Sequence, residues 1–599
     1  MTPTDTRPVN PAGPTLSAAW RRVRDLLPGR ADWHSVRLSP RRDLVAGLTV
    51  AIVALPLALA FGVTSGLGAE AGLVTAVVAG AVAAIFGGSN LQVSGPTGAM
   101  TVVLVPVVAQ FGPTGVLMVG ALAGLILIAL AFARLGRFVR YLPVPVIEGF
   151  TAGIAVVIAL QQVPAALGVT DAQGDRVWAV AADAVTRFVV HPQPAAIAVA
   201  LAVAAVMLLG ARWRPGLPFS LLGVVAATLL AEFAPVDLLR IGALPQGLPA
   251  PSLDFLDPGA VGVLLPAALA VAALAALESL LSATVADGMT VGQRHDPDRE
   301  LFGQGLANLA SPMFGGIPAT AAIARTAVNV RAGAASKLAA LTHAVALAGI
   351  VLVAAPLVGR IPLAALAGVL LATTVRMVEA ASLWALARAT RGDALVLVLT
   401  FAVTVVWDLV TAVAVGVGVA IVVALRAVAR SAKLEQVPLD SSEHTAEEQA
   451  LLAEHIVAYR LDGPLFFAAA HNFLLRLSDV ADVRAVILRM SRVSAIDATG
   501  AHVLGDAIRR LQGRGITVLL SGVAPGHEQV LDTLGVADQL RRDGLVFADT
   551  PSAIGYARTL ALATSGDREG RRGQAATLRV AAAEAVGRGA AETSGSAER

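Results

Sequence analysis

Two charged side chains lie in stretches of this chain that are otherwise apolar. Glu278 stands in the body of a long apolar run. Arg325 lies further along the chain, after a charged loop and a segment of small residues. A charge at membrane depth is costly, so such residues usually serve a function or pair with each other. We therefore interpret both residues as parts of a functional site, with a permanent ion pair between them as the alternative.

Two prolines predict where an anion would bind. Pro96 and Pro318 each suit the first turn of a short helix, where the missing N–H costs nothing. If two such helices meet near the membrane midplane, their free N–H groups and positive dipole ends converge on one point. Arg325, about two turns inside the second helix, would add a fixed positive charge. The alternative is that the prolines and their small neighbours serve only helix packing. The residues expected to line the site are Pro96, Thr97, Gly98, Ala99, Ala319, Thr320, Ala321 and Arg325.

Glu278 is the candidate coupling group. Near a bound anion, protonation of one carboxylate relieves repulsion and so links proton uptake to anion binding. The loop that follows contains Asp287, His295, Asp296 and Glu300, which we interpret as a solvated loop rather than a metal cluster. No metal site and no cofactor are expected.

The composition is that of a polytopic membrane protein. Of 599 residues, 56% are hydrophobic and only 15% are charged, whereas a soluble protein carries roughly 25% charged residues. No Asp, Glu, Lys or Arg occurs from Ala71 to Ala133. The chain has no cysteine, which excludes disulfides and cysteine nucleophiles. It also has no Walker, GxSxG, HExxH or GxGxxG motif, so we expect neither an enzyme nor a nucleic-acid partner.

Hydropathy predicts fourteen membrane spans over residues 44–430. With an even count, the Arg-rich loops lie on the side of the N-terminus and the Arg-poor loops lie opposite, as the positive-inside rule requires. We therefore expect both termini in the cytosol, a cell (inner) membrane location and a cytoplasmic N-terminal segment over residues 1–43. The predicted spans are 44–63, 71–87, 93–110, 114–134, 143–168, 194–210, 217–234, 258–286, 301–315, 318–331, 336–357, 362–384, 392–408 and 410–428.

A weak internal repeat supports the paired-helix interpretation. The turn Phe86-Gly87-Gly88 precedes Pro96, as Phe314-Gly315-Gly316 precedes Pro318. Short helices interrupted by Gly or Pro at matching places of two halves point to a transporter binding site. Because each half has seven spans, the halves must be inverted relative to each other.

A soluble α/β domain follows the membrane part. Over residues 437–555 the chain alternates strands such as VRAVILRM with helices such as GAHVLGDAIRRLQGRG, and a further helix is expected near 468–477. Thr499 lies between a strand and a helix, where its hydroxyl could be a phosphorylation or anion-contact point, or simply a helix cap. The Ala-, Gly- and Arg-rich tail over residues 564–599 is expected to be disordered.

Three segments in this order resemble the sulfate permease family of anion transporters. They are SGPTGAM at 94–100, VADGMTVGQRHDPDRELFGQGLANLASPMFGGIPATAAIARTAVNVRAGA at 285–334, and SAIDATGAHVL at 494–504. The resemblance implies fourteen spans in two inverted seven-helix repeats, divided into core and gate domains and followed by a cytoplasmic STAS domain. It also implies that the substrate lies between the third and tenth helices, where the helix dipoles predict an anion.

The resemblance implies roles for individual residues, although not every functional position of the family is matched. Glu278 falls at an acidic position of the eighth helix that resembles a sodium ligand of sodium-coupled bicarbonate members, and Ser282 matches a hydroxyl ligand one turn later. Ile323 falls where those members supply a Thr, which favours protons over sodium. Arg325 matches the basic residue that family members place beside the anion. Thr499 matches the phosphorylated serine of anti-sigma-factor antagonists, which share the STAS fold.

We therefore predict a secondary active anion transporter that acts as a proton-coupled symporter, by an elevator-like motion of core against gate. Sulfate, bicarbonate and small dicarboxylates are candidate substrates, and a homodimer in the lipid bilayer is expected. Three alternatives stay open: a sodium-coupled bicarbonate symporter, a nucleobase permease of the related seven-plus-seven fold, and a membrane signalling protein based on the STAS domain.

Overall fold

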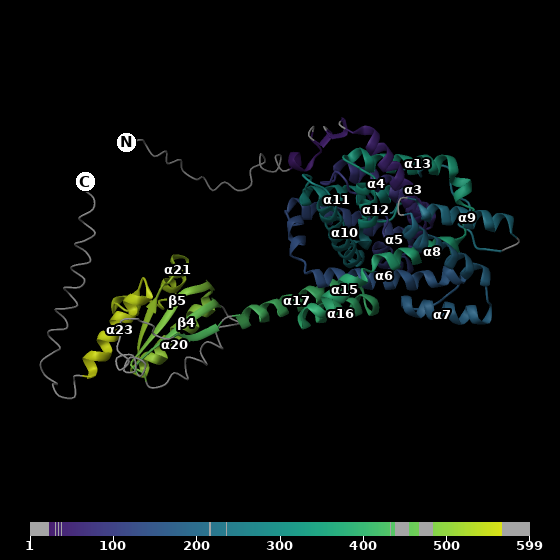
Figure 1. The fold of residues 1–599 in the computed structure, drawn as a ribbon. Helices are drawn as coiled ribbons and strands as arrows, with labels where there is room; N and C mark the ends of the chain where they lie inside the picture. Colours follow the sequence, from purple (N-terminus) through teal and green to yellow (C-terminus); the bar gives the residue numbers. More distant parts are fainter. Residues whose placement is uncertain are drawn as a thin grey trace, which may run out of the picture. The chain divides into compact units, whose positions relative to one another are not determined.

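The computed structural model describes residues 23–29, 32–33, 35–37, 39–214, 217–234, 237–431, 433–437, 455–465 and 483–565. It divides into two compact units, Met1–Ala420 and Ile421–Arg599. Figure 1 shows helices throughout the first unit and a sheet with helices in the second. The helix expected near 468–477, the tail beyond residue 565 and residues 1–22 of the N-terminal segment lie outside the described residues.

One set of helices in the first unit packs mainly within itself, and we call it the first helix group. Glycines at the crossings make the close packing possible. A side chain on Gly72 of α4 would strike Ala58 O in α3, and one on Gly124 of α5 would strike Gly305 O in α11. The group comprises α3 (Pro40–Thr64), α4 (Ala69–Phe86), α5 (Gly98–Phe132), α10 (Val261–Met289), α11 (Pro297–Met313), α12 (Ile323–Arg331) and α13 (Lys337–Val358).

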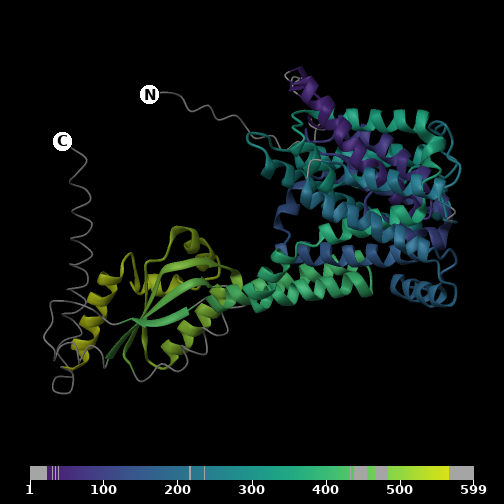
Figure 2. The same cartoon turned by 45° about the vertical axis from the view of Figure 1, so that its right-hand side comes forward.

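The second helix group packs around α6. Gly149 and Gly153 of α6 let α16 approach closely, and Thr404 of α16 lies against Gly153. Ser382 Oγ donates to Glu148 Oε1 at 3.1 Å, which joins α15 to the start of α6. Figures 1 and 2 both show α16 beside α6 and α7 at the edge of the bundle. The group comprises α6 (Val144–Leu167), α7 (Val177–Val190), α8 (Pro194–Trp213), α9 (Phe219–Phe233), α14 (Leu363–Met377), α15 (Ala380–Ala389) and α16 (Arg391–Val406), after which α17 (Leu409–Ser431) follows.

Each of the fourteen predicted spans contains a helix. By length and composition, nine helices within the described residues could cross a membrane. The third and fourth spans are joined in α5, whose halves meet at Gly112 with a φ of 70°. The twelfth span is divided between α14 and α15. The amphipathic α7 is not among the predictions, because Asp183 and Arg187, which form an ion pair of 2.7 Å, make its segment resemble a loop.

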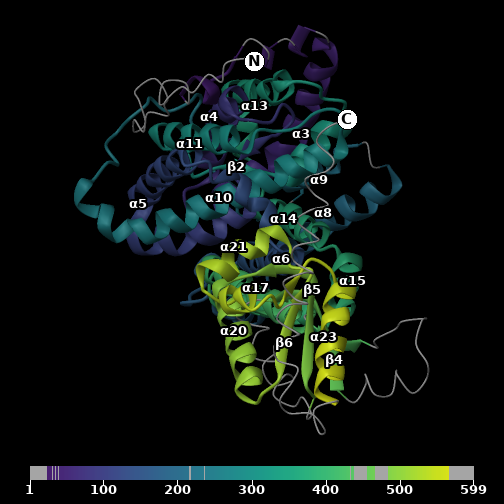
Figure 3. The same ribbon diagram turned by 90° about the vertical axis from the view of Figure 1, so that its left-hand side faces the viewer.

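Two short strands lie beside the prolines of the predicted site. β1 (Ser94–Gly95) pairs with β2 (Thr320–Ala321) in antiparallel order, with Ser94 opposite Ala321 and Gly95 opposite Thr320. Extended backbone inside a membrane protein needs hydrogen-bond partners, and these two segments supply them to each other. Figure 3 shows β2 in the interior of the helical bundle, near α10 and α11.

The strands shift both helix starts away from the predicted positions. α12 begins at Ile323, five residues after Pro318, so the prediction that Pro318 starts a helix is wrong. α5 begins at Gly98, and Pro96 likewise precedes it. Arg325 is the third residue of α12 and not two turns inside it. The error arose because the pairing partner of each segment is more than two hundred residues away in the chain.

The second unit contains a five-stranded sheet in the order β3-β4-β5-β6-β7. β3 pairs with β4 in antiparallel order, and the remaining neighbours are parallel. Apolar residues of the sheet and of the helices form one core. The elements are β3 (Lys433–Val437), β4 (Ile456–Leu465), β5 (Ala485–Ile496), α20 (Ala498–Gly513), β6 (Thr517–Ser521), α21 (Pro525–Thr533), α22 (Asp538–Arg542), β7 (Val546–Phe547) and α23 (Thr550–Ser565).

Candidate anion-binding site

The strand pairing brings the starts of α5 and α12 together. Thr97, two residues after β1, is the N-cap of α5, and its hydroxyl accepts from Met100 N at 3.4 Å. Ala322 is the N-cap of α12, and an alanine side chain offers no acceptor for the first N–H groups of a helix. The first two residues of α12, Ile323 and Ala324, are exposed. Free donors and the positive end of a helix dipole are therefore accessible at this point.

Glu278 of α10 lies at the start of α5. Thr97 Oγ1 donates to Glu278 Oε2 at 2.9 Å, and the Glu278 side chain is half-buried. The Thr97 hydroxyl thus links the carboxylate to the N-terminus of α5, since it donates to one and accepts from the other. A change in the charge of Glu278 would therefore change the electrostatic potential at the predicted anion position.

We call the pairing of β1 with β2, together with the helix starts that follow each strand, the crossing. Arg325 is buried, with 2% of its surface exposed, and it joins the two halves of the crossing. Its Nη2 donates to Pro96 O at 2.7 Å. The guanidinium lies against Gly95, whose φ of 153° favours glycine and where a Cβ would stand 2.5 Å from Arg325 Nη1. Nη1 is buried and finds no acceptor among the described residues. One donor of Arg325 is therefore committed to the backbone, and another is left unpaired beside the crossing.

Hydroxyl groups of α10 hold β2 and α12 in place. Ser279 Oγ lies 2.9 Å from Thr320 Oγ1 and accepts from Ala321 N at 3.2 Å. Ser282 Oγ donates to Thr326 Oγ1 at 2.9 Å, and both side chains are fully buried. Of the predicted residues, Thr320 and Ser282 therefore belong to the support of the crossing.

A polar stripe of α11 also supports β2, and the sequence analysis missed it. Asn308 clamps Ala319: its Oδ1 accepts from Ala319 N and its Nδ2 donates to Ala319 O, both at 2.8 Å. Gln304 Nε2 donates to Ser94 Oγ at 2.6 Å, and Ser311 Oγ donates to Ile317 O at 2.9 Å. The signal was present, because polar residues at 304, 308 and 311 lie on one face of a helix.

The interpretation of the charged segment as a solvated loop is wrong for Glu300, which is the fourth residue of α11 and is buried. Glu300 is 2% exposed, and its Oε2 accepts from Gly88 N at 2.9 Å and from Ser89 N at 3.1 Å. His295 Nδ1 lies 2.7 Å from Asp287 Oδ2. Glu300 thus ties the start of α11 to the turn after α4. Within the part of the chain that the structure describes, no three His, Asp or Glu residues are placed to hold a metal ion.

An ion pair fixes α11 to the segment before α3. Asp32 accepts from Arg299 Nη1 at 2.7 Å and from Arg299 Nη2 at 2.8 Å. Burial alone would raise the pKa of Asp32, but the hydrogen bonds from Arg299 and from Gly29 N outweigh it and hold the pKa below its usual value. Asp32 therefore stays charged, and the helix that carries the polar stripe is anchored at its start.

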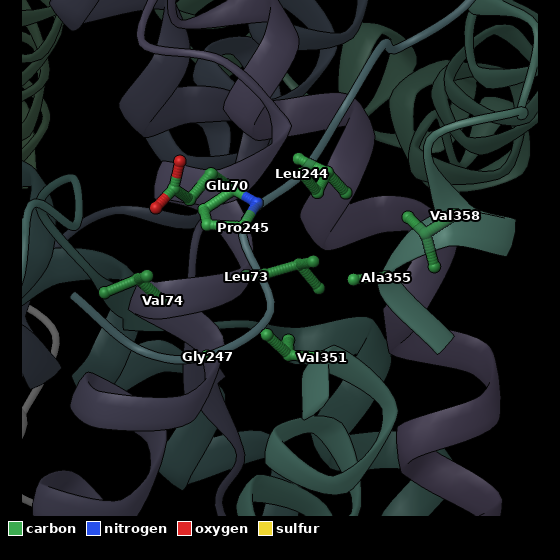
Figure 4. A pocket seen from close by; sticks show the side chains of 9 residues that line it. All are labelled: Glu70, Leu73, Val74, Leu244, Pro245, Gly247, Val351, Ala355 and Val358. Carbon is green, nitrogen blue, oxygen red and sulfur yellow. The ribbon is translucent and has the colours of Figure 1, made fainter. Parts of the chain in front are cut away.

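Two further features are not part of the crossing. Thr499 is exposed in the first turn of α20, and the cap is Asp497, whose Oδ1 accepts from Gly500 N at 2.7 Å. A small pocket lined by α4, α13 and residues 244–247 contains none of the predicted site residues (Figure 4).

Family models match two parts of the chain. The model of the sulfate permease family matches residues 41–400, and the model of the STAS domain matches residues 449–553. The first match includes both strands of the crossing and all the helices of the first group.

Relatives match over most of their own length. The putative sulfate transporter YvdB of Bacillus subtilis is 34% identical over 507 residues, which are 83% of this chain and 94% of that protein. The bicarbonate transporter BicA of a Picosynechococcus species is 32% identical over 515 residues, which are 82% of this chain and 90% of that protein.

Solved structures have the same fold. The transmembrane domain of a cyanobacterium bicarbonate transporter BicA matches with a TM-score of 0.58 and 34% identity, over 63% of this chain and 97% of that chain. The overall structure of SLC26A9 matches with a TM-score of 0.76, over 94% of this chain and 99% of that chain, and at 18% identity it shows the fold alone. The predicted family and fold class are confirmed. This chain is a multi-pass membrane protein of the sulfate permease family, with a C-terminal STAS domain.

Proposed function

We propose that this protein is a secondary active transporter that carries a small anion across the cell membrane together with a proton. The observation that carries the proposal is the antiparallel pairing of β1 with β2, which brings two helix N-termini and Arg325 to one place. Helix N-termini favour anions because their N–H groups are free and their dipole ends are positive. The names of the relatives YvdB and BicA support sulfate and bicarbonate as candidate substrates.

In this proposal the anion contacts backbone donors first. The N–H groups at the starts of α5 and α12 would bind its oxygens, with Thr97 and the residues on either side of it close by. Such donors recognise charge and size more than chemical identity, so sulfate, bicarbonate and small dicarboxylates remain candidates. Arg325 has two roles: it fixes Pro96 through Nη2, and its charge, held in a buried position, attracts the anion.

Glu278 is the proposed coupling residue. When it is ionised, its charge opposes an anion at the same helix start, and protonation removes that repulsion. Its bond to Thr97 puts the carboxylate next to the donors that the anion would use. Anion and proton would then bind together, which is symport.

Sodium coupling is the second candidate mechanism, as in a sodium-coupled bicarbonate symporter. It would use Glu278 and Ser282 as oxygen ligands. One observation favours protons: the exposed Ile323 side chain offers no oxygen. A sodium ion needs several oxygen ligands in place of its water shell.

Movement would occur between the two helix groups. We infer that the first group, which carries the crossing, slides against the second in an elevator-like manner, and that the protein is a homodimer in the inner membrane with both termini in the cytosol. The grouping of helix contacts supports the first inference, and the Arg-rich loops on one side support the orientation.

Uptake by proteoliposomes tests the proposal. Purified protein is reconstituted and offered labelled sulfate, bicarbonate and fumarate, each with a proton gradient, with a sodium gradient and with neither. We expect uptake of at least one anion, driven by the proton gradient without sodium. Uptake that requires sodium would select the second mechanism. Competition by uracil would select a nucleobase permease, and no uptake of any anion would reject transport of these substrates.

A further inference from the structure

One buried histidine of the first helix group has no role in the site described so far. His343 lies in α13, and 0% of its surface is exposed. Its Nδ1 and its Nε2 are both buried and have no hydrogen-bond partner among the described residues. A neutral imidazole has one donor and one acceptor, and burying either without a partner costs free energy. Buried polar groups of this kind are usually satisfied by an ordered water or serve a function.

Contacts of α13 place His343 level with Arg325. Ala340, one turn before His343, belongs to a small apolar cluster against which Val328 packs. Val328 lies one turn after Arg325 in α12. The short connection over residues 332–336 turns the chain back between the two helices. The step from Ala340 to His343 along α13 therefore runs in the same direction as the step from Val328 back to Arg325.

Helix α4 packs beside both side chains. Arg325 Nη1 lies 2.5 Å from the Cβ position of Gly95, and Ala76 Cα of α4 lies 3.4 Å from the same position. One turn further along α4, a Cβ on Gly80 would stand 3.8 Å from the Cβ of Ala344, the residue after the histidine. The guanidinium and the histidine thus lie about one helical turn apart along α4, which is roughly 5 Å. At this separation the charge of the guanidinium acts on the imidazole.

The unpaired atoms of the two side chains are complementary. Arg325 Nη1 can only donate, whereas the imidazole nitrogen that carries no proton can only accept. Neither is bonded directly to the other or to any other described group. A water molecule that accepts from Nη1 and donates to His343 would satisfy both, and a water-mediated hydrogen bond is nearly as favourable in enthalpy as a direct one.

We propose that His343 is a positioning residue of the anion site, which holds the guanidinium of Arg325 through one shared water. Nη2 of Arg325 is already fixed by Pro96 O. With Nη1 held as well, the plane of the guanidinium has one orientation at the crossing, whereas with Nη2 alone it can turn about that single bond. His343 does not bind the anion itself. This inference rests on the proposed transport function.

Substitution of His343 tests the positioning role. His343→Leu has no side-chain polar atom, whereas His343→Gln and His343→Asn keep one acceptor and one donor group. The matched control is Thr342→Val in the same helix, because the Thr342 hydroxyl donates to Leu338 O of its own helix at 2.7 Å. Each full-length protein is reconstituted, and labelled anion uptake is measured over a range of concentrations, which separates KM from the maximal rate.

We expect His343→Leu to raise the KM for the anion by about twofold to tenfold, the effect of one hydrogen bond, with little change in the maximal rate. At least one amide variant should restore the KM, and Thr342→Val should match the unmodified protein. In an Arg325→Lys background, which has no Nη1, His343→Leu should add nothing. An unchanged KM in His343→Leu would overturn the proposal, and so would failure of both amide variants or an equal loss in the Arg325→Lys background.

Structures separate this inference from the proposed function. In a cryo-EM map of the unmodified protein in nanodiscs, we expect density for a water between Arg325 Nη1 and His343. In the map of His343→Leu, the guanidinium should be turned or less well ordered. A map without that water, or an unchanged guanidinium in the variant, would reject the positioning role. If the unmodified protein takes up no anion, the proposed function fails, while the two maps still test whether His343 holds Arg325.

Discussion

Arg325 reaches Pro96 O because Gly95 has no side chain. The guanidinium lies where a Cβ of Gly95 would be, and the φ of 153° at this residue is one that other amino acids rarely adopt. Residue type alone indicated Arg325, Glu278 and Thr97 as candidates for the anion site. The partner of Arg325 could not be predicted, because it depends on how two distant segments pair.

The substitution Gly95→Ala is expected to displace Arg325 from Pro96 O. The added methyl group would clash with Nη1, and overpacking of this kind costs about 1–3 kcal/mol. We expect anion uptake to fall and the melting temperature in detergent to drop. The matched control is Gly349→Ala in α13, where a Cβ would meet nothing within 4 Å. Equal uptake by the two variants would contradict the placement of Arg325.

The substitution Glu278→Gln is expected to remove the dependence of uptake on the proton gradient. A carboxylate must be protonated to accept an anion beside it, so uptake by the unmodified protein should rise as the outside becomes more acidic. Glutamine is neutral at every pH, so the variant should transport at a rate that hardly changes with pH. The measurement is uptake against external pH at constant membrane potential. An unchanged pH profile in the variant would exclude Glu278 as the coupling group.

At the scale of elements, the broken helices were predicted but their strands were not. The turns Phe86-Gly87-Gly88 and Phe314-Gly315-Gly316, each followed by a proline, indicated a break before each short helix. The pairing of β1 with β2 involves only two residues from each strand, which is too few for a strand pattern in the sequence. α7 was not predicted, because its polar face lowered the mean hydropathy of its segment.

The polar stripe of α11 carries an element-scale prediction. Asn308→Leu removes both bonds to Ala319 and leaves a buried N–H and a buried carbonyl unpaired, each at a cost of about 1–3 kcal/mol. We expect β2 to loosen, with a lower melting temperature and weaker uptake. Asn90→Leu is the control, because Asn90 is only half-buried and its bond to Gln293 is 3.5 Å long. If both variants melt at the same temperature, Asn308 does not support β2.

At the scale of the whole molecule, composition and hydropathy predicted the architecture. The content of 15% charged residues indicated helices buried in lipid, and the change to a soluble composition after residue 430 indicated a second unit, which begins at Ile421 in the structure. The lengths of the helices were harder to predict. The nine-residue α12 is too short to cross a bilayer alone, and the extended segment that contains β2 precedes it.

The two units lead to a prediction about the STAS domain. A chain that ends at Lys433 keeps both helix groups and the crossing, since contacts within the first unit do not involve the sheet. We expect such a chain to retain anion uptake in proteoliposomes, with the full-length protein measured in parallel. Complete loss of uptake by a truncated protein that still elutes as a single species would assign the STAS domain a direct part in transport.

Replacement of Arg325 tests the central claim most directly, because this residue joins the crossing and supplies its fixed charge. We expect Arg325→Ala to lower proton-driven anion uptake on the order of tenfold or more, which corresponds to about 1.4 kcal/mol or more of lost interaction. Arg325→Lys, which keeps the charge but not the planar fork, should retain part of the uptake. Full uptake by Arg325→Ala at subsaturating anion would contradict the account.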